Sequence, residues 1–248
     1  MNQAPQQPVI DILPDPQGVA DRAAKWIADR TAQTSETFRI ALAGGNTPRA
    51  LYCELVAPPL RDRIDWRRIE LFWGDERYVP HDDPRSNYRM VRETLLAHAP
   101  IPIDHVHPVM LEGGVESGAR HYEALLKSAY GADVLSPARP LFDLVLLGVG
   151  TDGHTASLFP GDWAMDESTN WTAAVVHNNE PRITLTYPAI HSSRAVAFLV
   201  TGIEKSEAVR RAIGGDLALP AARVRSQGEI VWFLDRAVAA NLAEAGTA

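Results

Sequence analysis

Residues 144–161, LVLLGVGTDGHTASLFPG, carry more information about fold and chemistry than any other stretch of this 248-residue chain. The stretch begins with four apolar residues, a pattern typical of a strand that is buried on both faces of a sheet. Three glycines follow within six residues, so the backbone can turn sharply and approach a ligand closely. His154 comes directly after this turn. Because open α/β sheets place their active sites at the carboxyl ends of strands, we predict a chemical site here.

The rest of the chain alternates short apolar runs with amphipathic stretches. This alternation predicts βαβ units, and therefore an α/β fold with a mostly parallel sheet flanked by helices. We expect buried strands at 38–43, 69–73, 142–147, 195–201 and 229–234, and a half-exposed strand at 182–186. We expect helices at 17–32, 48–56, 88–98, 116–130 and 203–213, and a last helix that Asp235 caps and that reaches residue 245. We expect a single domain over residues 1–248, with a possible small excursion about 160–195.

Composition and charge exclude several function classes. The formal net charge is −7, and no basic run with interleaved aromatic residues is present, so we expect no nucleic-acid partner. The first residues lack the charged and apolar regions of a signal peptide, and no apolar run approaches the ~20 residues of a membrane span. We therefore expect a cytoplasmic protein with no membrane partner. Cys53, the single cysteine, is predicted to be a buried structural thiol. The oligomeric state is not determined by the sequence, and a monomer is the expectation.

A glycine-containing turn, Gly44-Gly45-Asn46-Thr47-Pro48, joins the first buried strand to a helix. Thr47 is a good N-cap residue, and proline is favoured at the first helical position. Backbone N–H groups and the positive end of the helix dipole favour an anion such as phosphate at this place. The turn matches neither the dinucleotide nor the nucleoside triphosphate motif. The alternative interpretation is an ordinary connection that happens to contain glycine.

Polar residues also follow the second buried strand, in the segment FWGDERYV at 72–79. Asp75 could position a hydroxyl group or orient an imidazole, and Arg77 could bind an anionic group with two hydrogen bonds. The alternative is a surface turn with solvated charges.

Three further sets of residues are candidates for parts of a site with His154 or for a site of their own. Asp152 precedes it by two residues and could support it, whereas the other seven histidines are expected to be structural or on the surface. Arg182 on the predicted 182–186 strand and Lys205 at the start of a helix are candidate anion ligands, because a lysine there opposes the helix dipole unless an anion binds. His105 and His107 resemble a metal-binding pair, but no Glu or Cys stands at a ligand spacing, so no metal site is expected.

With these residues in place, the chain resembles the 6-phosphogluconolactonase family. The resemblance is carried in order by ALAGGNTPRALY, FWGDERYVPHDDPRSNYRM, LVLLGVGTDGHTASLFPG, PRITLTYPAI and GIEKSEAV, at 41–52, 72–90, 144–161, 181–190 and 202–209. It implies a Rossmann-like three-layer sandwich and hydrolysis of 6-phospho-D-glucono-1,5-lactone in the oxidative pentose phosphate pathway. It implies no cofactor.

The related glucosamine-6-phosphate deaminases are the main alternative. They share the GGNTP-like and GxGxDGH loops, but they typically carry a glutamate five positions after the histidine, where this chain has Phe159. Ester hydrolysis does not need that acid/base group, so Phe159 favours the lactonase over a sugar-phosphate isomerase or deaminase. A sugar-phosphate sensor without activity is a third, weaker hypothesis.

The lactonase hypothesis assigns a role to each candidate residue. His154 is the general base that activates water, with Asp152 or Asp75 supporting it. Loop N–H groups or Arg77 stabilise the negative charge on the carbonyl oxygen. The 6-phosphate is bound by Gly44, Gly45, Asn46 and Thr47, together with Arg182 and Lys205.

Overall fold

The computed structural model describes residues 7–242, and its centre is a seven-stranded sheet. All described strand pairs of this sheet are parallel. In spatial order the strands are β1 (Val9–Leu13), β10 (Glu229–Asp235), β9 (Ser193–Val200), β6 (Phe142–Leu147), β2 (Phe38–Leu42), β3 (Ile69–Trp73) and β5 (Val106–His107). The five predicted buried strands are therefore confirmed. Their apolar side chains are buried because helices or a second sheet cover both faces.

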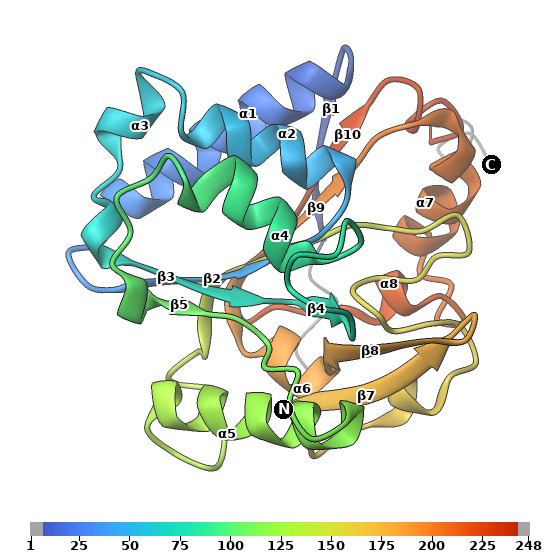
Figure 1. Cartoon of the computed structure of the whole chain (residues 1–248). Coiled ribbons are helices and arrows are strands. Elements are labelled where there is room, and N and C mark those ends of the chain that lie inside the picture. Colours follow the sequence, from blue (N-terminus) through green and yellow to red (C-terminus); the bar gives the residue numbers. More distant parts are fainter. Residues whose placement is uncertain (1–6, 243–248) are drawn as a thin grey trace.

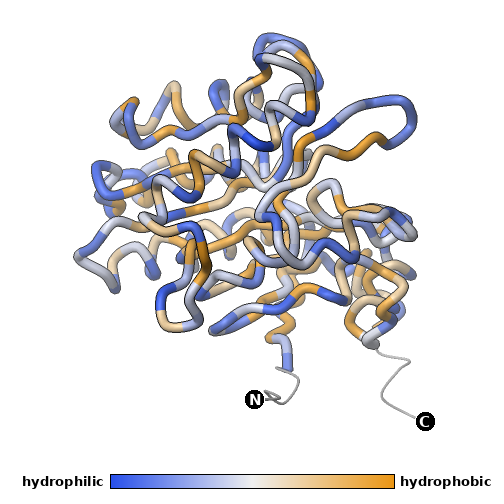
Figure 2. The backbone as a smooth tube through the Cα atoms, turned by 90° about the horizontal axis from the view of Figure 1, so that it is seen from below, coloured by the Kyte–Doolittle hydropathy of each residue, from blue (hydrophilic) through white to orange (hydrophobic). Residues whose placement is uncertain are grey.

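Helices and a second sheet complete three layers (Figure 1). On one face lie α1 (Pro16–Ala32), α2 (Asn46–Leu55), α3 (Leu60–Arg63) and α4 (Asn87–Val91), and on the other lie α5 (Val115–Tyr130), α6 (Tyr187–His191) and α8 (Pro220–Arg223). The eight-residue helix α7 (Ser206–Ile213) packs against α8. Figure 2 shows hydrophobic backbone through the middle of the molecule and hydrophilic turns at its periphery. The predicted three-layer α/β sandwich is confirmed.

A small antiparallel sheet lies beside the main one, with the order β4 (Asp75–Arg77), β8 (Glu180–Leu185) and β7 (Thr172–His177). Strand β8 confirms a strand at the place expected at 182–186, but the expected half-exposed character is wrong, because Ile183, Thr184 and Leu185 are buried. The predicted excursion at 160–195 contains β7 and β8, but β4 joins them from the segment after β3. This pairing brings residues that are about a hundred positions apart in the sequence to the same edge of the central sheet.

Short helical segments connect these elements. They are 3₁₀ turns at Trp66–Arg68, Ile103–His105, Trp163–Asp166 and Ile203–Lys205, and a π-helical turn at Arg92–Leu96. The helix expected at 88–98 is thus α4 followed by the π turn. The helix expected at 203–213 is a 3₁₀ turn followed by α7.

Three further local predictions are wrong: the N-cap of α2, the burial of Cys53 and the helix after Asp235. The N-cap of α2 is Gly45 and not Thr47, because the turn ends two residues earlier, with Gly45 at a φ of 101°. Cys53 is exposed, because Pro48, Leu51, Tyr52 and Leu55 form the buried stripe of α2.

The carboxylate of Asp235 does accept a hydrogen bond from the Val238 N–H, at 2.8 Å. The residues after it form turns up to residue 242 rather than the expected helix, and residues 243–245 of that helix lie outside the described part.

Within residues 7–242, no helix is both long and apolar enough to cross a bilayer.

Candidate active site

A pocket of about 270 Å³ opens between β2 and β6, at the point where the strand order of the sheet reverses. From β2 the chain proceeds through β3 to β5 on one side, and from β6 through β9 to β10 on the other, so the loops after β2 and β6 separate. The residues that directly follow β2, β3 and β6, namely Ala43, Gly74 and Gly148, all line the pocket. The pocket therefore lies at the carboxyl ends of the strands, as predicted from residues 144–161.

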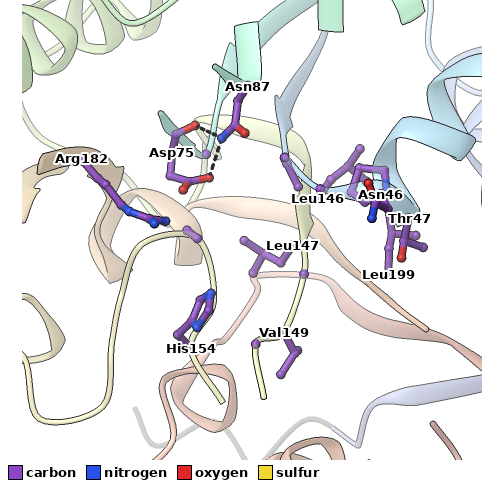
Figure 3. A pocket seen from close by; sticks show the side chains of 18 of the residues that line it. Asn46, Thr47, Asp75, Asn87, Leu146, Leu147, Val149, His154, Arg182 and Leu199 are labelled. Atoms are coloured by element: carbon purple, nitrogen blue, oxygen red, sulfur yellow. Dashed lines mark hydrogen bonds between the residues drawn. The ribbon is translucent and has the colours of Figure 1, made fainter. Parts of the chain in front are cut away.

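Nine of the ten predicted site residues line this pocket: Gly44, Gly45, Asn46, Thr47, Asp75, Arg77, His154, Arg182 and Lys205. In Figure 3, His154 and Arg182 lie on one side of the pocket and Asn46 and Thr47 on the other. Asp152, the tenth residue, lines a neighbouring hollow behind His154. The structure therefore brings together residues that are separated by up to 161 positions in the sequence, from Gly44 to Lys205.

Asp152 is the carboxylate that contacts His154. Its Oδ1 lies 2.6 Å from Nδ1 of the imidazole and 3.1 Å from the backbone nitrogen of His154. Partial burial pushes the pKa of Asp152 upward, but the backbone N–H and the imidazole of His154 outweigh this effect, and the pKa is lowered. Asp152 is therefore ionised at neutral pH.

This contact decides which ring nitrogen of a neutral His154 carries the proton. An ionised carboxylate only accepts hydrogen bonds, so Nδ1 must be the donor. Nε2 is then unprotonated and is the nitrogen that can accept a proton from a bound molecule.

Glycine at position 150 makes room for the imidazole. A Cβ atom at Gly150 would be closer to Nδ1 and Cε1 of His154 than van der Waals contact allows. The ring of Phe159 packs against the same imidazole, with the centroids 4.7 Å apart.

Asp75 is held by other partners. Its Oδ2 accepts a hydrogen bond from Ser157 Oγ at 2.7 Å, and its Oδ1 accepts one from Asn87 Nδ2 at 3.3 Å (Figure 3). It is buried at the start of β4 and faces the pocket. Asp75 therefore orients Ser157 and Asn87, whereas Asp152 contacts the histidine.

Asn87 is a pocket residue that the sequence reasoning did not single out. Its Nδ2 donates to the backbone oxygen of Asp75 at 2.9 Å. Its Oδ1 occupies the place where a Cβ atom at position 44 would stand, so any side chain at that position must displace the Asn87 amide. Asn87 lies within the family-like segment 72–90, which was the only available signal for it.

Glu76 was also missed, and it anchors Asn87. Its carboxylate is 1% exposed and accepts hydrogen bonds from the backbone N–H groups of Arg77, Asn87 and Tyr88 and from Ser86 Oγ. Burial raises the pKa of Glu76 to about 7, although these N–H groups oppose the rise. Glu76 thus ties the start of α4 to β4.

Arg77 and Arg182 form a pair of cations at the pocket. They stand directly opposite each other in the β4–β8 pair, and both line the pocket. Arg182 Nη2 lies 2.5 Å from Glu180 Oε2, whereas the Nε atoms of both arginines are buried without a hydrogen-bond partner among the described residues. Like charges opposite each other destabilise a sheet, so this arrangement favours a bound anion between them.

The start of α2 forms the other side of the pocket. Its N-cap Gly45 has no side chain to bind the first N–H groups, so these donors are available to a ligand. The Thr47 hydroxyl is 2.8 Å from that of Thr201, which fixes the helix start to the loop after β9. Lys205, the N-cap residue of α7, lines the pocket from the same loop region.

No group of three or more His, Cys, Asp or Glu side chains within residues 7–242 is arranged to hold a metal ion. His107 stacks on Phe72 with the centroids 4.6 Å apart, and Nδ1 of His105 lies 3.2 Å from the backbone oxygen of Ile69. Both histidine side chains therefore pack against or contact the protein itself.

Comparison with known proteins identifies the family of this chain. Residues 14–232 match the family of glucosamine-6-phosphate isomerases/6-phosphogluconolactonase. The chain belongs to this family. A 6-phosphogluconolactonase from Synechocystis sp. is 38% identical over 242 residues, which cover 95% of this chain and 98% of that protein. One from Mycobacterium tuberculosis is 43% identical over 213 residues, which cover 82% of this chain and 84% of that protein.

The solved structure of the 6-phosphogluconolactonase from Trypanosoma brucei is similar with a TM-score of 0.83 and 30% identity. The match covers 96% of this chain and 99% of that chain. This family member and the present chain thus share the fold over nearly their whole lengths.

Proposed function

We propose that this protein hydrolyses 6-phospho-D-glucono-1,5-lactone to 6-phosphogluconate in the oxidative pentose phosphate pathway. The observation that carries the proposal is the Asp152–His154 pair, whose imidazole lines a pocket together with Arg77, Arg182 and Lys205. An unprotonated imidazole nitrogen beside several cations suits general-base hydrolysis of a phosphorylated ester. The names of the family members described above support the same reaction.

In the proposed reaction, Nε2 of His154 removes a proton from a water molecule while the water oxygen attacks C1 of the lactone. The C1–ring oxygen bond then breaks, and the imidazolium returns the proton to that oxygen, which becomes the C5 hydroxyl of the product. The carboxylic acid formed at C1 ionises and releases one proton. The lactone carbonyl is already electrophilic, so a positioned base suffices without a covalent nucleophile or a metal.

Asp152 stabilises the transient imidazolium and keeps Nδ1 protonated. Asp75 positions Ser157 and Asn87, and through them the pocket surface. Backbone N–H groups of the loop after β6, or Arg77, stabilise the negative charge that develops on the carbonyl oxygen.

The 6-phosphate is assigned to the start of α2, from Gly44 to Thr47, with Lys205 and Arg182. Free N–H groups at a helix start and nearby cations both favour a dianion. The phosphate then holds the lactone so that C1 faces His154.

Phe159 argues against the deaminase alternative. It is buried and stacks on His177, so an aromatic ring fills the position where the deaminases carry a glutamate. No acid/base group is present at that position.

The proposal is tested with lactone that glucose-6-phosphate dehydrogenase generates in situ. The wild type should accelerate lactone loss over the spontaneous rate, and His154→Ala should lower kcat by at least about a hundredfold. Full activity in the variant would refute the role of His154. No acceleration by the wild type would refute the lactonase function, and ammonia release from glucosamine 6-phosphate would favour the deaminase. The cytoplasmic location and the monomeric state stay predictions.

A further inference from the structure

The ring of Phe159 lies between two histidines. One is His154, at 4.7 Å between centroids and 44° between planes. The other is His177 at the end of β7, at 3.7 Å and 3°, which is a parallel stack. Within residues 7–242, Phe159 is the one aromatic ring that packs on the imidazole of His154.

The position of Phe159 is itself well defined. The residue is 4% exposed, so its ring cannot move without moving its neighbours. His177 covers its outer side and is paired with Glu180 across the β7–β8 turn. The guanidinium of Arg182 lies over the same ring, 5.6 Å from its centroid. Phe159 belongs to the same loop after β6 as His154, whereas His177 belongs to the small sheet.

The hydrogen bond to Asp152 alone does not orient the imidazole. The Nδ1–Oδ1 contact restrains one atom of the ring, and small coupled rotations about χ1 and χ2 can still tilt the ring plane and displace Nε2. A second contact on the face of the ring removes this freedom. Phe159 provides that contact, and an aromatic face also favours the positive charge that His154 carries during turnover.

We propose that Phe159 is a positioning residue for His154 and that His177 holds Phe159 in place. The inference rests on the proposed function, in which Nε2 of His154 acts on water. It gives His177 of the small sheet an indirect part in proton transfer, because His177 holds Phe159 and does not itself contact the proton. Loss of the stack should therefore act mainly on kcat. Phe159 does not line the pocket, and Arg182, which lies over its ring, is also held by Glu180.

Two pairs of enzymes test this proposal in the lactone assay. Phe159→Leu should lower kcat at least about tenfold while KM stays within about twofold of the wild type, since small displacements of a catalytic group cost large factors in rate. His177→Ala should lower kcat about threefold to fivefold, and His177→Phe, which keeps a stacked ring, should stay within about twofold of the wild type. Thermal melting of each variant separates loss of fold from loss of orientation.

An unchanged kcat in a folded Phe159→Leu variant would overturn the proposal, as would a rise in KM alone. Equal kcat values for His177→Ala and His177→Phe would also overturn it. If Phe159→Leu melts below the assay temperature, the proposal is tested by comparing His177→Ala with His177→Phe, since His177 is only half-buried. An inactive wild type would refute the proposed function instead, so the two failures are distinguishable.

Discussion

The two sides of the pocket hold their polar groups by different means. On the α2 side, formed by Gly44, Gly45, Asn46, Thr47 and Lys205, the donors are mostly backbone N–H groups at the start of one helix. On the His154 side, the imidazole depends on the Asp152 carboxylate and the Phe159 ring of its own loop, and on His177 of β7, which stacks on Phe159. The backbone of one helix start can thus supply most of the anion donors, to which Lys205 and Arg182 add cations from other elements. The proton acceptor, in contrast, is a side chain whose orientation depends on other side chains.

Asn87 joins the two sides. On the α2 side, its amide fills the space beside Gly44 where a Cβ atom would stand. On the His154 side, it donates a hydrogen bond to Asp75, which also binds Ser157. Glu76 in turn holds the backbone of Asn87. Changes on the His154 side should therefore act on kcat, changes on the α2 side on KM, and changes at the junction on stability.

The largest effect is expected at Asp152, on the His154 side. Asp152→Asn should lower kcat by about a hundredfold, because the amide no longer enforces a protonated Nδ1 or stabilises the imidazolium. Steady-state kinetics with in situ lactone measures the change. Asp75→Asn is the matched comparison, since Asp75 bonds to Ser157 and Asn87 instead. A larger loss of kcat in Asp75→Asn than in Asp152→Asn would reverse the assignment.

The second effect concerns the junction and depends on pH. The pKa of Glu76 is raised by burial from 4.5 to about 7, so this group contributes stability below about pH 4.5 that is lost as the pH rises through about 7. Glu76→Gln removes this dependence and should itself destabilise the fold. The gap in unfolding free energy between wild type and variant should therefore shrink by about 2 kcal/mol from pH 5 to pH 8. Denaturant titrations at both pH values measure it, and a constant gap contradicts the prediction.

The third effect is expected on the α2 side. Lys205→Ala should raise KM about tenfold and change kcat little, because a charge-assisted contact to the phosphate is lost. Lys25→Ala, at an exposed position of α1, is the control and should match the wild type. If Lys205→Ala lowers kcat and leaves KM unchanged, the α2 side takes part in the chemistry and the comparison fails.

The smallest effect separates two pocket glycines. Gly44→Ala should lower the unfolding free energy by about 1 kcal/mol, because the new methyl group meets the Asn87 amide. Gly148→Ala should be nearly neutral, since no atom lies within 4 Å of its Cβ position. Equal stability of the two variants would contradict the prediction, because it would show that Asn87 moves aside for the new methyl group at no cost in free energy.

Much of the fold could be predicted because each buried strand is a short apolar run of its own. Residues 142–147 and 195–201 needed no distant information, since both faces of a central parallel strand are covered. The details that failed depend on neighbours. Cys53 was misassigned because the chain alone does not say which stripe of α2 meets the sheet, and Thr47 because its hydroxyl bonds to Thr201 rather than to its own helix.

The amino-acid sequence by itself determined the α/β class, the glycine-rich loop with His154, and the phosphate-suited start of α2, because each is a local pattern. Only the tertiary structure chose Asp152 over Asp75 as the partner of His154, and only it revealed Glu76, Asn87 and the Phe159–His177 stack. The physical reason is that these contacts depend on the folded paths of the loops after β3 and β6 and on the strands beside them, β4, β8 and β7. Contacts of that kind leave no periodic trace in the chain.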